Sequence, residues 1–253
     1  MGRIIAIANQ KGGVGKTTTA VNLSAAMAEK GMRVLLADLD PQGNSTSGLG
    51  VDKSTDGSIY DLLVNDYGIE QCIRRNVWMS LDLLPSTVDL AGAEIELLDF
   101  DRHEFILKRK LADVKDDYDY VLIDCPPSLN ILTVNALTTA DSVLIPIQCE
   151  FYAMEGLTQL MYTIQLVQKK LNPKLSIEGV VCTMYDGRTN FSQQVVDSVR
   201  EYLQDLVYQT IIPRNIRLAE APSHGIPILE YDKRSAGAEA YRRLAAEVIA
   251  AKR

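Results

Sequence analysis

Short apolar runs alternate along the chain with segments in which apolar residues recur at helical spacing. The runs are rich in β-branched residues and most lack strict apolar–polar alternation, which is typical of strands buried on both faces of a parallel sheet. We expect strands at residues 3–8, 33–37, 81–84, 120–123, 142–147, 177–184 and 207–212. Because strands that alternate with helices form parallel crossover units, the pattern predicts an α/β fold with a doubly wound, mostly parallel sheet and helices on both faces.

The segments between these runs have helical periodicity. Residues 17–30 are followed by Gly31, a typical helix stop, and residues 236–251 place apolar side chains on one face. A third apolar stripe consists of Leu157, Leu160, Met161, Ile164, Val167 and Leu171. Residues 56–65 and 88–115 also look helical, although the pattern does not show how they pack.

The sequence NQKGGVGKTTT, residues 9–19, lies between the first expected strand and the first expected helix. A glycine-rich turn in that position directs several backbone N–H groups and the positive end of the helix at one point, which makes an anion site. Gly15, Lys16 and Thr17 match the end of the phosphate-loop pattern G-x-x-x-x-G-K-[ST]. Gln10 stands where that pattern has its first glycine. Lys16 is placed to reach the β- and γ-phosphates of a nucleotide, and the Thr17 hydroxyl to bind Mg²⁺.

Three aspartates follow apolar runs that we expect to be neighbouring strands. Asp38 and Asp40 come after one run, and Asp124 ends another in the pattern of a Walker B strand. Because the carboxyl ends of the strands hold the ligands of a doubly wound sheet, these side chains should lie beside the glycine-rich loop. Asp124 is the candidate for holding Mg²⁺ through water. Asp38 and Asp40 have an alternative role, in which they cap a turn before Pro41.

Composition limits the classes of function. The chain has 253 residues with 47% apolar content and no repeat or linker, so we predict a single domain over residues 1–253. With 26 basic and 33 acidic side chains the net charge is −7, so a nucleic-acid site must be a local patch. The absence of any apolar run of about 18 residues, and of a signal-peptide core, predicts a cytoplasmic protein. The cysteines lack the spacing of a metal site and are expected to be reduced, mostly buried thiols: Cys72, Cys125, Cys149 and Cys182.

Residues 11–18, KGGVGKTT, resemble the variant phosphate loop of the ParA/MinD group of ATPases, which carries an added signature lysine, here Lys11. From the opening of the loop, Lys11 cannot easily reach its own γ-phosphate, but it can project to the phosphates of a facing molecule. Residues 38–44, DLDPQGN, resemble the first switch of the family, in which the second aspartate, here Asp40, positions the attacking water. Residues 125–128, CPPS, are similar to the second switch. The resemblance covers nearly the whole chain and is closest to the short chromosomal ParA proteins called Soj.

The resemblance implies an ATPase that uses ATP and Mg²⁺ and forms a homodimer in the ATP state. The residues that it implies around the phosphates are Lys11, Gly12, Gly13, Val14, Gly15, Lys16, Thr17 and Thr18. Lys11, Lys16 and Asp40 would have the catalytic roles. Thr17 and Asp124 would hold the metal.

Two further segments gain roles from the resemblance. Glu150 would approach the signature lysine of the second subunit, with a merely exposed carboxylate as the alternative. In the family, the segment that here begins at Pro213 packs against adenine. Pro213 would offer the base an apolar surface, and Asn215 a donor and an acceptor. A plain strand-to-turn transition is the alternative explanation of these two residues.

Soj-like proteins bind double-stranded DNA without sequence preference as ATP-bound dimers, which implies a nucleoid-associated protein. Such binding needs only a few Lys or Arg side chains on DNA phosphates. The candidates are Arg188, Arg214 and Arg217, although each alone is also typical of a solvated surface. A ParB-type centromere-binding protein is the implied partner, and it would stimulate ATP hydrolysis.

Other readings of the same motifs remain. A MinD-like membrane-associated positioning ATPase would share the loop and both switches, but residues 241–249 fit a core-facing helix better than an amphipathic anchor, so we expect no stable membrane association. An iron–sulfur relative would need cysteines placed to bind a cluster. A ligase of the dethiobiotin synthetase type would use ATP on a small carboxylic substrate. A nucleotide-binding scaffold without catalysis remains if Asp40 does not place a water.

Overall fold

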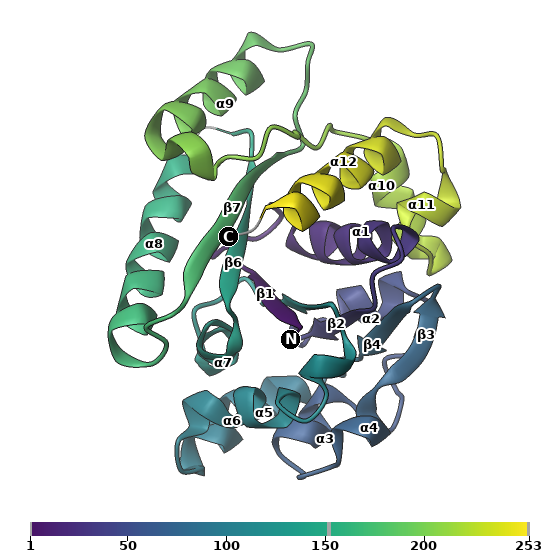
Figure 1. The fold of residues 1–253 in the computed structure, drawn as a ribbon, viewed down its shortest axis with the longest axis vertical. Coiled ribbons are helices and arrows are strands. Elements are labelled where there is room, and N and C mark those ends of the chain that lie inside the picture. Colours follow the sequence, from purple (N-terminus) through teal and green to yellow (C-terminus); the bar gives the residue numbers. More distant parts are fainter. Residues whose placement is uncertain (1, 151–152, 252–253) are drawn as a thin grey trace.

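Seven strands of the described chain form one sheet. The computed structural model describes residues 2–150 and 153–251. The strands are β1 (Arg3–Ile7), β2 (Val34–Asp38), β3 (Arg74–Trp78), β4 (Leu81–Leu84), β5 (Tyr120–Asp124), β6 (Ser142–Gln148) and β7 (Ser176–Thr183), in the order β3-β4-β2-β5-β1-β6-β7 (Figure 1). Every neighbouring pair is parallel except β3 with β4. The predicted α/β fold with a mostly parallel sheet is therefore confirmed.

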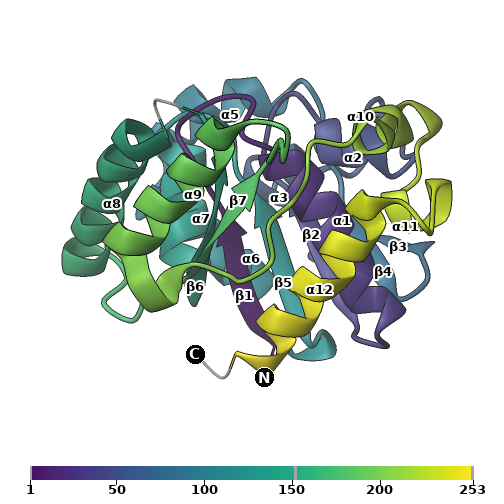
Figure 2. The same cartoon turned by 90° about the horizontal axis from the view of Figure 1, so that it is seen from above.

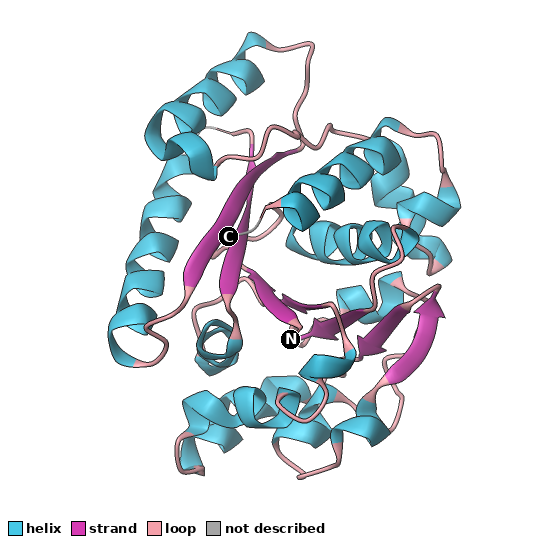
Figure 3. Ribbon diagram, in the orientation of Figure 1, coloured by secondary structure: helices cyan, strands magenta, loops and turns pink. Residues whose placement is uncertain are grey.

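Helices cover both faces of the sheet, because successive residues of a strand point to opposite sides (Figure 3). Ile5 and Ile7 of β1 face one layer, whose helices are α1 (Lys16–Glu29), α10 (Ile216–Glu220), α11 (Ile228–Tyr231) and α12 (Ala236–Ala250). Ile4 and Ala6 face the other, with α3 (Ile59–Leu63), α4 (Ile69–Cys72), α5 (Leu90–Glu96), α6 (Ile106–Leu111), α7 (Ile131–Thr139), α8 (Ala153–Lys170) and α9 (Asn190–Leu203). The remaining short elements are α2 (Asn44–Gly48) and the 3₁₀ turns η1 (Leu97–Asp99), η2 (His103–Phe105), η3 (Lys115–Asp117), η4 (Gln204–Leu206) and η5 (Ala221–His224).

The long predicted helices are confirmed. Helix α1 matches the segment 17–30 and α12 the segment 236–251, each within a residue or two. The stripe on α8 packs into the core, with Leu157, Leu160, Ile164 and Val167 buried. All four cysteines are buried free thiols, as expected. None of the described helices is both long enough and apolar enough to cross a membrane.

The strand predicted at residues 207–212 is wrong. This segment runs beside β7 and keeps only isolated contacts with it, such as the bond from Tyr208 N to Val180 O at 2.9 Å. The carboxylate of Glu247 on α12 accepts the backbone N–H groups of Gln209 at 2.8 Å and Thr210 at 2.9 Å. Because these donors are used by a side chain, no regular ladder forms.

Two other segments differ from the prediction. Residues 88–115 are not one helix: the backbone is extended at Phe100 and left-handed at Arg102 (φ +50°), so α5 and α6 are separate. The sequence also gave no signal for β3, an edge strand of mostly polar residues. Asp82 of β4 holds β3 in place, since it accepts the Asn76 N–H at 2.7 Å.

Two glycines in contact fix the loop after α2 against η5. Gly50 (φ +75°) and Gly225 (φ +66°) are both left-handed, and a Cβ on Gly225 would lie 2.7 Å from the Gly50 Cα. The close atoms at both positions belong to the backbone and cannot move away without a large energetic cost, so only glycine fits at both positions.

We predict that Gly225→Ala lowers the free energy of unfolding by about 2–4 kcal/mol, because left-handed strain and a backbone clash add together. Gly31→Ala is the matched control: Gly31 also has a positive φ (+84°), but a Cβ there would meet no atom within 4 Å. The control should cost only about 1 kcal/mol. Urea denaturation measures both, and equal losses would contradict the proposed clash.

Candidate functional site

The glycine-rich loop joins β1 to α1 at the carboxyl edge of the sheet, which is uppermost in Figure 2. Gly13 (φ +74°) and Gly15 (φ +86°) are left-handed, which turns the chain sharply into the first turn of α1. A Cβ on Gly12 or Gly13 would meet no atom within 4 Å, so the backbone there is open to a ligand. The geometry is that of an anion cradle at a helix N-terminus.

Neighbouring strands hold this loop rigidly. The Asn9 side chain accepts the Lys11 N–H at 3.0 Å and donates to the Pro146 carbonyl in β6 at 2.8 Å. The Thr183 hydroxyl, at the end of β7, donates to the Val14 carbonyl at 2.8 Å. The loop is therefore fixed by two strands before any ligand binds, which lowers the entropy cost of binding.

Lys16 is a buried cation at the centre of the loop. Its side chain is largely buried, and its Nζ donates to the Lys11 carbonyl at 3.1 Å. Burial lowers the pKa of Lys16, while the nearby Asp124, Cys125 and Asp40 oppose this shift. A desolvated cation beside open N–H groups suits a phosphate.

Asp124 lies next to Lys16 with one oxygen unused. Ser45 donates to its Oδ2 at 2.8 Å, whereas no hydrogen bond from the described residues reaches its buried Oδ1. Burial and the adjacent Asp38 charge raise the pKa of Asp124 to about 8, and the Ser45 and Thr17 hydroxyls oppose the rise. A buried carboxylate oxygen without a partner, near a hydroxyl, is a donor set that fits Mg²⁺. Asp124 and Thr17, the predicted metal residues, are thus brought together.

Asp38 has a different role from Asp124. Its Oδ2 accepts both the backbone N–H of Thr46 at 2.8 Å and the Thr46 hydroxyl at 2.7 Å. Burial raises the pKa of Asp38 to about 6, against the effect of these bonds. Asp38 therefore anchors α2 to the end of β2.

Asp40 caps a turn, because its Oδ1 accepts the Gln42 N–H at 2.9 Å. Its charge is nevertheless close enough to Lys16 to oppose the lowering of that lysine's pKa by burial. The Asp40 carbonyl accepts the Ser86 hydroxyl at 2.8 Å, which ties this segment to the end of β4. Asp40 thus lies at the site while one of its carboxylate oxygens holds the turn.

Lys11 contacts Glu150 of the same chain. The Lys11 Nζ lies 3.4 Å from the Glu150 Oε2, and the two side chains are 33% and 47% exposed. The Gln148 amide also donates to the other oxygen of Glu150. The sequence led us to expect this pairing of residue types between two subunits, and the structure contains it within one.

A cavity of about 380 Å³ opens beside the loop. Pro213 and Asn215, the two predicted base contacts, both line it. The Asn215 Oδ1 accepts the Arg217 N–H at 2.8 Å and so caps α10, which leaves its Nδ2 for a ligand. Sequence reasoning missed other lining residues, among them Thr183, Met184, Ile212, Leu218 and Tyr241. Thr183 and Met184 could have been found from the sequence, because they lie at the carboxyl end of the predicted strand 177–184, where ligands bind.

The predicted DNA-binding arginines lie near this cavity on two adjoining segments. The Arg214 N–H donates to the Tyr185 carbonyl at 2.8 Å, so the segments that carry Arg188 and Arg217 are neighbours. Arg188 pairs with Asp186 at 2.6 Å, and Arg217 with Glu220 at 2.9 Å. Ion pairs at such exposed positions are weak, so the arginines can exchange a carboxylate for a phosphate.

Known proteins are similar to this chain over nearly its whole length. The family model described as an AAA domain matches residues 2–177. The chain is 59% identical over 251 residues to the sporulation initiation inhibitor protein Soj of Bacillus subtilis, covering 99% of each. It is 52% identical over 250 residues to the chromosome partitioning protein ParA of Myxococcus xanthus, covering 98% of this chain and 88% of that relative.

The solved structures agree. A cobyrinic acid a,c-diamide synthase of Mycobacterium smegmatis, with a bound ATP analogue and magnesium, has a TM-score of 0.87 and 41% identity to this chain, covering 98% of this chain and 95% of that one. The P-loop fold predicted from the sequence is therefore confirmed.

We predict that Lys16→Ala weakens binding of ATP, the nucleotide that the sequence predicts, by about 100-fold, because it removes a desolvated cation from the phosphate cradle. Isothermal titration calorimetry in Mg²⁺ measures the affinity. Lys30→Ala, at the exposed end of the same helix, is the control and should bind as the wild type does. Undiminished affinity in Lys16→Ala would remove the phosphate-loop assignment.

Proposed function

The chain belongs to the ParA/Soj family of P-loop ATPases, and we propose that it acts as an ATP-dependent switch in partitioning a chromosome or plasmid. It is an ATPase with ATP and Mg²⁺ as cofactors. The observation that carries the proposal is that one loop presents two cations: Lys16 is buried at the cradle, and Lys11 is held at the loop entrance by a weak, half-exposed ion pair. A single nucleotide needs only the first.

In the proposed mechanism each residue has one task. The loop N–H groups and Lys16 bind the phosphates, and the cavity with Pro213 takes the base. Thr17 and Asp124 would hold Mg²⁺, which supplies positive charge to the phosphate oxygens. Asp40 orients the attacking water, with the turn that it caps keeping the carboxylate in place.

Dimerisation follows from the charge of the triphosphate. One loop contributes a single buried lysine, so a second cation from a facing subunit would further neutralise the γ-phosphate. Lys11 would leave Glu150 for that phosphate. The exchange is favourable because an exposed lysine–carboxylate pair is worth only about 0–1 kcal/mol.

The dimer would bind double-stranded DNA without sequence preference. Arg188, Arg214 and Arg217 lie on two adjoining segments of each chain, so a dimer would double the phosphate contacts. A ParB-type centromere-binding protein would speed hydrolysis and release the dimer, as the family resemblance implies. This supports a nucleoid-associated location.

A MinD-like membrane-associated ATPase is the alternative. The apolar face of α12, including Tyr241, Leu244 and Val248, is buried against the core and α1. That face is therefore committed to packing, which favours the partitioning role.

We predict that Asp40→Asn binds ATP normally but hydrolyses it at least about tenfold more slowly, because the amide keeps the cap to Gln42 and loses the charge that orients water. Dimers should then accumulate with ATP and Mg²⁺ by light scattering, and not with ADP. Lys11→Ala should remain monomeric under the same conditions, and Asp52→Asn, an exposed carboxylate outside the site, should behave as the wild type. Wild-type turnover in Asp40→Asn would place the catalytic role elsewhere, and monomers throughout would refute the switch.

We predict that Arg188→Ala and Arg217→Ala weaken DNA binding but leave ATP-driven dimerisation intact. Each removes two phosphate contacts per dimer, so the slope of log K against log salt should fall by about 1.8. Arg33→Ala is the matched control, because Arg33 also pairs with an aspartate, Asp119 at 2.9 Å, but at the start of β2 on the opposite edge. A filter-binding series over salt gives the slopes. If all three variants lose affinity equally, the patch is wrong.

A further inference from the structure

Residues 88–99, which include α5 and η1, present an apolar stripe to solvent. Val88, Ala91, Ile95 and Leu98 recur at intervals of three and four, the spacing of one helix face. Val88 and Ile95 are each 75% exposed, and Leu98 is 56% exposed. A second stripe, Leu90, Ala93 and Leu97, is fully buried in the core. The segment is thus apolar on two faces, of which the fold covers one.

An acidic stripe runs beside the apolar one. It consists of Asp89, Glu96 and Asp99, which directly follow Val88, Ile95 and Leu98 and are all exposed. The chain has no Lys or Arg between Arg75 and Arg102. Within residues 2–150 and 153–251 none of these three carboxylates forms an ion pair. The surface is therefore apolar with an uncompensated negative edge.

This surface is connected to both switch segments. It begins two residues after Ser86, whose hydroxyl donates to the Asp40 carbonyl and whose N–H donates to the Thr46 hydroxyl at 2.9 Å. Glu94 on α5 accepts a hydrogen bond from Asn130, the residue that caps α7 after the second switch. Figure 2 shows α5 at the same edge of the sheet as the glycine-rich loop.

We propose that residues 88–99 are the docking surface for a basic amphipathic helical segment of a partner protein. Apolar residues of that segment would cover Val88, Ile95 and Leu98, and its lysines or arginines would pair with Asp89, Glu96 and Asp99. The negative edge disfavours DNA and anionic lipid as occupants, and it disfavours a second copy of the same surface. The inference rests on the proposed function in one respect: a segment bound here acts on the switches and so changes ATP hydrolysis.

The test uses a synthetic peptide of about 20 residues with leucines at three- and four-residue spacing and lysines beside them. A second peptide has glutamate in place of lysine. Fluorescence anisotropy measures binding to the full chain without nucleotide, and the ATPase rate is measured separately. The variants are Ile95→Ser with Leu98→Ser, and Asp89→Asn with Glu96→Gln and Asp99→Asn.

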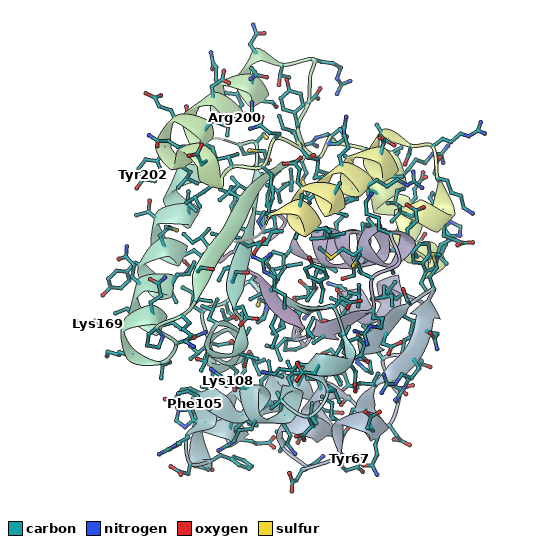
Figure 4. The ribbon with its side chains drawn as sticks, in the orientation of Figure 1. Tyr67, Phe105, Lys108, Lys169, Arg200 and Tyr202 are labelled. Atoms are coloured by element: carbon teal, nitrogen blue, oxygen red, sulfur yellow. The ribbon has the colours of Figure 1, made fainter. Side chains whose placement is uncertain are left out.

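Each set should reduce affinity for the lysine peptide about tenfold, because it removes either the apolar contact or the exposed charge pairs. The apolar control is Tyr162→Ser with Tyr202→Ser, at side chains 63% and 65% exposed on α8 and α9; Tyr202 points outward in Figure 4. The acidic control is the exposed triple Asp113→Asn, Asp116→Asn and Asp117→Asn. Both controls should bind as the wild type does.

Failure to bind the lysine peptide, equal binding by all variants, or equal binding of the glutamate peptide would each overturn the proposal. A dimer-to-monomer change in Ile95→Ser with Leu98→Ser would also overturn it, since a second copy would then be the occupant. Because binding is measured without nucleotide, these outcomes are independent of whether the chain dimerises on ATP. Binding without any change in ATPase rate would overturn the link to the switches alone.

Discussion

Buried charge at the ends of adjacent parallel strands is the constraint on which this structure depends. The register of β2 and β5 places Asp38 beside Asp124, and the loop after β1 brings Lys16 to the same point. Burial raises the pKa of both aspartates, the Asp38 charge raises that of Asp124 further, and burial lowers the pKa of the lysine. Burying these charges costs free energy. Hydrogen bonds from hydroxyl groups and the attraction between the lysine and the aspartates offset part of that cost, and a bound cation would offset more of it.

The same carboxylates also hold the first switch segment. Asp38 binds Thr46 and Asp124 binds Ser45, so both contacts reach consecutive residues of α2. A cation held by Asp124 would therefore act directly on the Ser45 hydroxyl, which ties α2 to this carboxylate. Ser86 extends this connection to the end of β4 and to the segment 88–99. A change in the hydrogen bonding of Asp124 can thus reach the surface segment 88–99 through a few consecutive hydrogen bonds, without a rearrangement of the whole fold.

The sequence predicted the parts of the fold that depend on local pattern. Buried parallel strands and the long helices α1, α8 and α12 have strong periodicity, and the phosphate loop is a contiguous motif. The prediction failed where contacts between distant parts of the chain determine the secondary structure. The Glu247 side chain accepts backbone N–H groups of residues 207–212 that a strand would use, and Asp82 holds the polar segment that forms β3. The same holds in the site. The resemblance paired Lys11 with Glu150 only between two subunits, and no local pattern showed that they meet within one chain or that the side-chain oxygen of Asn215 caps a helix.

The pair of Lys11 with Glu150 sets how readily the free chain gives way to the proposed dimer. A buried pair would cost several kcal/mol to break and would hold the lysine in place, whereas this half-exposed pair is worth about 1 kcal/mol or less. Gln148 also donates to Glu150, so this carboxylate would keep a hydrogen-bond partner if the lysine left. Nucleotide binding then needs only a modest difference in affinity between the two states to shift the population. A contact of this strength suits a switch that must reset after each round of hydrolysis.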